Sequence, residues 1–207
     1  MIYLAATDSG VIAIDLGWTG ARRKLERGLA RLGATPADVR YVFLTHAHRD
    51  HTHGWRFVKQ ARFVIGAAEV PYFTGAARYR ALYTRIGDRL VEYPHPKPGE
   101  LSLIPLGADT TFMLGRDTVQ SFAIPGHTPG STAYLFRGVL FGGDAINWRP
   151  WAGFRGARPG FSDDITRSRA SMQALWARLD SSRVHVACSA HAKCGRVDNA
   201  FRQAVLR

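Results

Sequence analysis

The chain has little of three features that would each define a class of protein. Cysteine occurs only twice, at Cys188 and Cys194, which is too few for the disulfide framework of a small secreted protein. No stretch approaches the ~20 consecutive apolar residues that a membrane span requires. The N-terminus has no basic segment followed by an apolar block, so no secretory signal is predicted. We therefore expect a cytoplasmic protein without a membrane partner.

Acidic residues are also scarce, because 16 Asp and Glu stand against 28 Lys and Arg, giving a net charge of +12. A strongly basic protein can bind a polyanion such as nucleic acid. The arginines are scattered, however, with no basic run of five or six residues and no aromatic–basic RNA-binding signature. Genome composition or an ion-paired, heat-adapted surface would give the same charge. The charge leaves a nucleic-acid partner open without favouring it.

Apolar residues are plentiful, at 46% of 207 residues, which suits a single domain over residues 1–207. Strands are predicted at 2–4, 11–14, 42–44, 62–65, 101–106, 111–114, 119–124, 132–136, 139–141 and 183–188. Helices are predicted over about 20–32, within 67–90, from Ser162 or Asp163 onward, and over about 196–205. Two successive groups of strands and helices indicate an α/β (α+β) fold, a four-layer αββα sandwich with two sheets face to face.

The most informative segment is Thr45-His46-Ala47-His48-Arg49-Asp50-His51, which follows the apolar run at 41–44. Three imidazoles and a carboxylate occur together there, and these are the ligand types that suit zinc and related divalent metals. So many titratable groups at a strand end would repel one another on protonation unless a cation organised them. The segment therefore predicts a metal site.

Three further candidate ligands, His127, Asp144 and His191, each follow a predicted strand. Loops at strand ends along one rim of a sandwich can converge on one point. Each residue also has an ordinary interpretation, as a turn histidine, a capping aspartate and a loop histidine. A ligand role is favoured for His127 because the histidine segment alone supplies one imidazole too few for a first metal. Asp144 is favoured because it is the candidate for a bridge between two metals.

In this order the residues resemble the metallo-β-lactamase superfamily of hydrolases. Its pattern is a strand-end Asp, then His-x-His-x-Asp-His, then a lone His, a lone Asp and a last His. The chain shows the whole pattern, in Asp15, His46, His48, Asp50, His51, His127, Asp144 and His191. The resemblance extends through nearly the whole chain and implies the four-layer fold.

The resemblance also implies a role for each residue. His46, His48 and His127 would hold a first metal. Asp50, His51 and His191 would hold a second metal, and Asp144 would bridge the two. Asp15 would orient the histidine loop by hydrogen bonds. Two divalent metals ~3.5–4 Å apart can share a hydroxide whose pKa is drawn toward neutrality. Zinc suits this ligand set, and iron or manganese would also fit.

Residues near Asp144 limit which reactions of the superfamily the resemblance implies. Asp144 stands where true β-lactamases usually have Cys or Ser, and residues 145–150 lack the Gly-Gly-Cys-Gly-Arg-like stretch of glyoxalase II-like thioesterases and persulfide dioxygenases. Asn147 stands where quorum-signal lactonases carry Tyr. We expect a bridging hydroxide that cleaves an ester, thioester or lactone of a small molecule, with Asp50 or a water handling the proton. A mononuclear-iron, persulfide-dioxygenase-like oxidoreductase and a phosphodiesterase or RNA-processing nuclease remain alternatives.

Aromatic residues offer candidate walls for a substrate cleft. Tyr72, Phe73, Tyr79 and Tyr83 could line it beneath a flap formed by residues 67–99, although helix packing explains them equally well. A second set follows the bridging candidate Asp144 and consists of Trp148, Trp151 and Phe154. For these residues, contact with substrate and packing on the surface are equally good explanations.

Other residues are expected to have ordinary roles. His53 is expected to start a helix, and Cys194 is expected to be a core thiol. A Cys188–Cys194 disulfide depends on a geometry that sequence does not give. A homodimer that covers the edge of the first strand is also left open.

Overall fold

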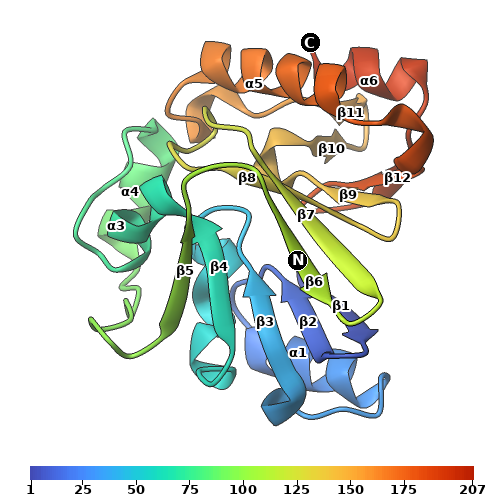
Figure 1. The fold of residues 1–207 in the computed structure, drawn as a ribbon. Helices are drawn as coiled ribbons and strands as arrows, with labels where there is room; N and C mark the ends of the chain where they lie inside the picture. The colour runs from blue at the N-terminus through green and yellow to red at the C-terminus, as the bar shows by residue number, and fades with distance from the viewer.

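The computed structural model describes residues 1–207, apart from the side chain of Ser181. Two β-sheets pack face to face, and helices cover their outer faces (Figure 1). This arrangement confirms the predicted four-layer αββα sandwich. Among the described residues, no helix has both the length and the apolar character needed to cross a membrane.

The first sheet has five strands in sequential order, β1 (Tyr3–Thr7), β2 (Gly10–Ile14), β3 (Val39–Phe43), β4 (Arg62–Gly66) and β5 (Ser102–Leu106). β1 and β2 form an antiparallel hairpin, whereas β2 to β5 run parallel. Parallel neighbours need crossover connections, which the helical segments between these strands supply.

The second sheet has the order β13-β12-β9-β8-β7-β6. Its strands are β6 (Thr110–Leu114), β7 (Asp117–Ala123), β8 (Thr132–Phe136), β9 (Val139–Phe141), β12 (Val186–Cys188) and β13 (Cys194–Arg196). β9 and β12 are parallel, and the other pairs are antiparallel. A separate hairpin, β10 (Asn147–Arg149) and β11 (Gly153–Arg155), follows β9.

The α-helices are α1 (Ala21–Ala30), α2 (Arg49–Thr52), α3 (Val70–Phe73), α4 (Leu82–Leu90), α5 (Ile165–Arg178) and α6 (Asn199–Val205). The helical material expected within 67–90 is divided, because Gly75 has φ 79° and ends α3 in the left-handed region that favours glycine. The cap of α5 is Asp164 rather than Ser162 or Asp163, since its side chain accepts a hydrogen bond from the backbone N–H of Arg167 at 2.8 Å.

Alternation along the strands divides the core into three layers. Val42 faces outward to the core beneath α1, whereas Phe43 faces the core between the sheets. α5 and α6 cover the outer face of the second sheet through residues such as Met172 and Phe201, as the upper part of Figure 1 shows. Both sheets are thus covered on both faces, and their strand ends are fixed relative to each other.

Candidate metal centre

The structure brings all seven predicted ligands together at one rim of the sandwich, where the carboxyl ends of several strands meet. They form two groups, within each of which the ligand atoms lie within 4.8 Å of one another. The first group is His46, His48 and His127 with Asp144, and the second group is Asp50, His51 and His191. These segments follow β3, β7, β9 and β12. Ends of strands from both sheets therefore build one site.

Asp144 lies between the two groups. Its Oδ1 is 3.0 Å from His191 Nε2 and 3.3 Å from His51 Nε2, and its Oδ2 is 3.7 Å from His127 Nε2. Asn147 holds the turn that carries this carboxylate, because its Nδ2 donates to the backbone oxygen of Asp144 at 2.7 Å. This position is the one a bridging carboxylate would need.

The first group consists of buried imidazoles that converge on one point. His127 Nε2 lies 3.3 Å from His46 Nε2 and 3.2 Å from His48 Nδ1. Burial holds the pKa values of His46 and His48 well below the usual range, and burial also lowers the pKa of His127. A lowered pKa favours the neutral ring, which is the form in which an imidazole can bind a metal.

The second group is more polar and more open. Burial pulls the pKa of His51 down, but the carboxylates of Asp15, Asp50 and Asp144 raise it well above its usual range. Burial would raise the pKa of Asp144, and the neighbouring His51 and His191 reverse this and hold it well below its usual range. His191 itself is exposed, with its Nε2 3.3 Å from Asp50 Oδ2.

Two atoms of the centre are left without hydrogen-bond partners in this geometry. They are His51 Nε2 and Asp144 Oδ1, both buried, whose close contacts with each other and with His191 lack the alignment of a hydrogen bond. Buried polar atoms are nearly always paired, so orphaned atoms need an explanation. A nitrogen and a carboxylate oxygen that face the same cluster are suitable ligands for a divalent metal. The donor set therefore fits a metal.

Asp15, at the end of β2, fixes the histidine loop from one side. Its Oδ1 accepts a hydrogen bond from the Thr45 N–H at 2.8 Å, and its Oδ2 lies 2.8 Å from His51 Nδ1. The second contact directs the other ring nitrogen of His51 toward the centre. Asp15 thus contacts the histidine loop at Thr45 and at His51, and its role in orienting the ligands stays a prediction.

Glu69 fixes the same loop from the other side, and sequence reasoning missed it. It is fully buried, and its carboxylate accepts hydrogen bonds from the Ala47 N–H at 2.8 Å, the Gly130 N–H at 2.7 Å and the Tyr79 hydroxyl. Ala47 lies between His46 and His48, and Gly130 lies in the turn after His127, so Glu69 ties together the two segments that carry the first group. Its position just after β4, at the same rim, is the signal that could have found it.

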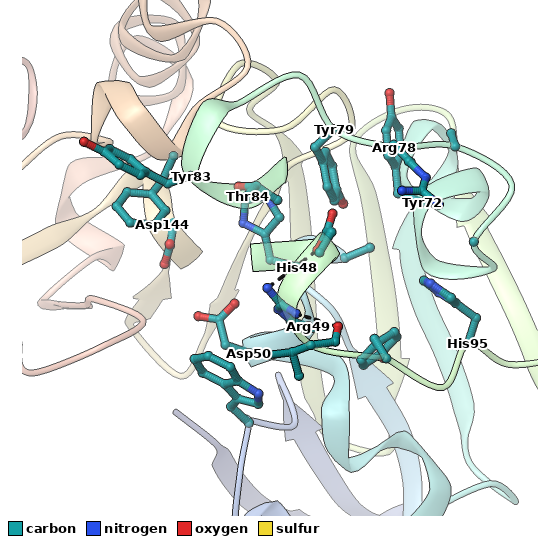
Figure 2. A pocket seen from close by; sticks show the side chains of 18 of the residues that line it. His48, Arg49, Asp50, Tyr72, Arg78, Tyr79, Tyr83, Thr84, His95 and Asp144 are labelled. Carbon is teal, nitrogen blue, oxygen red and sulfur yellow. Dashed lines mark hydrogen bonds and ion pairs between the residues drawn. The ribbon is translucent and has the colours of Figure 1, made fainter. Parts of the chain in front are cut away.

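A cavity of about 560 Å³ opens over the centre. Its lining includes His48, Asp50 and Asp144 of the centre, together with Tyr72 and Tyr79 (Figure 2), whose rings stack 4.2 Å apart. Tyr83, from α4, also lines it and packs against Phe161. The prediction that Phe73 lines the cavity was wrong, because its side chain is buried in the core under the first sheet.

The second predicted set of aromatic residues does not line this cavity. The β10–β11 hairpin directs the ring of Phe154 onto Phe201 at 4.8 Å and leaves Trp151 exposed. Trp148 lies beneath the Lys193 ammonium. Asn147, Arg158 and Phe161 occupy the corresponding part of the cavity wall. His53 begins a 3₁₀ helix, His53–Phe57, as expected.

Cys188 and Cys194 form a disulfide between β12 and β13. The expectation of a core thiol at Cys194 was wrong, because pairing of these two strands places the cysteines opposite each other and leaves Cys194 exposed. The disulfide closes the loop 189–193, which carries His191. One predicted ligand therefore sits in a covalently closed loop.

With fold and site described, comparison with known proteins gives the family. The sequence pattern of the Metallo-beta-lactamase superfamily matches residues 1–191, and the chain belongs to this superfamily. The chain is 30% identical over 178 residues to a hydroxyacylglutathione hydrolase of Anaeromyxobacter dehalogenans, a match that covers 86% of this chain and 56% of that protein. It is 29% identical over 108 residues to the N-acyl homoserine lactonase AttM of Agrobacterium fabrum, covering 51% of this chain and 39% of that protein.

A solved structure supports the fold. The subclass B3 metallo-beta-lactamase BJP-1 of Bradyrhizobium japonicum superimposes with a TM-score of 0.66 at 24% identity, covering 91% of this chain and 70% of that chain. The chain thus spans little more than half of the hydroxyacylglutathione hydrolase, and this structural likeness concerns the fold alone.

Proposed function

We propose that the chain is a metal-dependent hydrolase that cleaves an ester, thioester or lactone of a small molecule at a centre of two divalent metals, with zinc as the metal. The observation that carries the proposal is the convergence of seven ligand-type side chains, two of whose buried atoms lack partners. The similarity to a hydroxyacylglutathione hydrolase and a lactonase supports carbonyl hydrolysis.

Each group has a distinct task in this proposal. His46, His48 and His127 would hold the first metal through neutral rings, and Asp50, His51 and His191 would hold the second, with Asp144 shared. Bound divalent metals supply a nucleophilic hydroxide near neutral pH and polarise the carbonyl group. Asp50, which is partly exposed and lines the cavity, would handle the proton.

The overall reaction adds water across the acyl bond. The bond from the carbonyl carbon to oxygen or sulfur breaks, and the products are a carboxylic acid and an alcohol or thiol. The cavity walls of Tyr72, Tyr79 and Tyr83 would hold the body of the substrate.

The oxidoreductase alternative is less well supported. A single iron would use histidines of the first group with Asp144 and leave Asp50 and His191 idle. Both of these residues instead approach the shared centre, His191 Nε2 lying 3.0 Å from Asp144 Oδ1. We therefore favour two metals.

Elemental analysis of the purified protein, together with a substrate panel, tests the proposal. We expect about two zinc per chain and turnover of at least one class among p-nitrophenyl esters, thioesters and lactones. About one iron per chain with oxygen uptake would support the oxidoreductase instead. Turnover of bis-p-nitrophenyl phosphate alone would support a phosphodiesterase.

A further inference from the structure

A second concavity adjoins the cavity over the metal centre. It has a volume of about 330 Å³ and is lined by Arg78, Tyr79, Arg80, Arg85, Asp88 and Arg89. Three of these residues, Arg78, Tyr79 and Asp88, also line the larger cavity. We call this concavity the arginine groove. The ring of Tyr79 lies 4.5 Å from the ring of His48, so the inner wall of the groove is one side chain away from the first group.

The four arginines of the groove lack the partners that surface arginines usually find. Among the described side chains, none of their guanidinium groups forms an ion pair or a hydrogen bond within the protein. Asp88 is the acid in the lining, and its ion pair is with Arg49 at 3.8 Å. Arg85 and Arg89 are four residues apart on α4, where like charges destabilise a helix. An anion in the groove would relieve this repulsion.

The groove is held in place by its surroundings. The Asp163 carboxylate accepts hydrogen bonds from the backbone N–H groups of Arg80 and Ala81, at 2.8 Å and 2.7 Å. These contacts attach the start of α4 to the segment just before α5. The Tyr79 hydroxyl is bonded to the buried Glu69. The arginines are therefore presented from a backbone that is anchored at this point.

We propose that the arginine groove binds a phosphate group of the substrate, and that the substrate is an acyl thioester or ester of a phosphorylated carrier. Guanidinium groups bind phosphate oxygens in bidentate fashion, and several around one concavity suit a group of high negative charge. Because the groove shares a wall with the cavity, one molecule can place its phosphate there and its carbonyl at the metals. This inference rests on the proposed function for the position of the carbonyl.

A matched pair of variants tests the groove. R85Q/R89Q removes two arginines spaced four residues apart on α4, and R23Q/R27Q removes two exposed arginines with the same spacing on α1. Both variants change the net charge equally, and neither alters a residue of the metal centre. An effect of R85Q/R89Q alone is therefore due to the groove and not to overall charge.

The kinetic test uses two zinc-loaded reactions that differ in the carrier. Acetyl-coenzyme A and S-acetyl-N-acetylcysteamine have the same thioester, but the second lacks phosphates. We expect R85Q/R89Q to raise KM for acetyl-coenzyme A roughly tenfold, as for two exposed charge contacts, and to leave the second substrate unchanged. R23Q/R27Q should change neither value. An equal effect of both variants, or no effect of R85Q/R89Q, would overturn the proposal.

A binding test separates the groove from the reaction. Adenosine 3′,5′-bisphosphate should bind the zinc-loaded wild type more tightly than adenosine, with an affinity that falls as salt is added and falls again in R85Q/R89Q. If the bisphosphate binds in this way but neither thioester is cleaved, the proposed thioester reaction is wrong, whereas the proposal that the groove binds phosphate stands. If the bisphosphate does not distinguish the two variants, the groove does not bind a soluble phosphate.

A third experiment, with lipid vesicles, tests whether the phosphate that the groove binds belongs to a lipid headgroup. Leu82, Ile86 and Leu90 are exposed along α4 beside these arginines, and an anionic lipid surface would contact both sets. Sedimentation with phosphatidylcholine vesicles, with and without phosphatidylglycerol, measures this. Binding that needs phosphatidylglycerol and is lost in R85Q/R89Q, without a preference for the bisphosphate over adenosine, would overturn the phosphorylated carrier and assign the groove to a lipid headgroup. Absence of both vesicle and bisphosphate binding ends the proposal.

Discussion

The first and second groups of the centre share Asp144 but are built in different ways. His46, His48 and His127 are buried imidazoles whose pKa values are lowered by burial. Backbone contacts of Glu69 fix their segments, and Ser162 Oγ lies 3.1 Å from His127 Nδ1. The second group has carboxylates around His51 and ends in the exposed His191 of a disulfide-closed loop. On the proposed two-metal function, this contrast predicts that the metal at the second, more exposed group leaves first.

The largest effect is expected from the first group. His48→Ala removes one of the three converging imidazoles, and we expect turnover to fall more than about 100-fold, beyond the range for supporting residues. Metal content measured by elemental analysis should fall to about one per chain, because the first group would keep only two of its three imidazoles. His185→Ala, an exposed histidine outside the centre, is the control and should retain both metals. Full activity of H48A after metal loss would contradict the proposed function.

A smaller and more selective effect is expected from His191→Ala. This change removes an exposed ligand from the second group and leaves the first group intact. We expect about one metal per chain to remain and turnover to fall about 10- to 100-fold, a loss that added zinc partly restores. Loss of both metals at once would show that the two positions are not independent, against the comparison drawn above.

Variants of Asp15 and Glu69, whose carboxylates support the ligand segments, test the difference between the two groups more directly. Asp15→Asn alters the contact to His51, whereas Glu69→Gln alters the contacts to Ala47 and Gly130. Each change should weaken metal binding about 10-fold or more, D15N at the second position and E69Q at the first. Stepwise metal removal by a chelator, followed by elemental analysis, measures this order. Identical removal profiles for D15N and E69Q would count against separate roles.

The smallest effect on activity is expected from the disulfide. Reduction, or the C188S/C194S variant, frees the loop 189–193 without removing a ligand. The short loop predicts a loss of about 2 kcal/mol in the free energy of unfolding on a chain-entropy basis, measured by denaturant titration. The second metal should exchange faster, while turnover at saturating zinc changes little. The reductant should have no effect on C188S/C194S, which serves as the control.

Much of the centre could be predicted because its residues lie at strand ends and are of the metal-binding type. His46 to His51 form one compact segment, and Asp144 and His191 each follow a recognisable apolar run. Short apolar runs likewise predicted most strands of both sheets, because strands covered on both faces are continuously apolar, as in β4 and β8. Local sequence patterns were therefore sufficient to predict the fold and the set of candidate ligands.

The features that were missed depend on contacts between distant segments. Glu69 stands alone in a run that reads as helix, and its importance arises only when Ala47 and Gly130 are brought to it. The Cys188–Cys194 disulfide requires the pairing of β12 with β13, which short strands do not specify by themselves. The direction of Trp148 and Phe154 depends on the β10–β11 hairpin, which follows no clear alternation.

The end of the sandwich opposite the metal centre is occupied by the hairpin turns at Asp8–Ser9, Gly115–Arg116 and Arg137–Gly138. An ion pair between Arg116 and Asp8 at 2.9 Å joins the first two turns, and one between Arg137 and Asp117 at 2.6 Å joins the third turn to β7. Since no ligand segment passes through this end, it offers a handle for laboratory work. A fluorophore or surface tether attached at Ser9 would leave the chemistry undisturbed, so that metal exchange could be followed on single immobilised molecules.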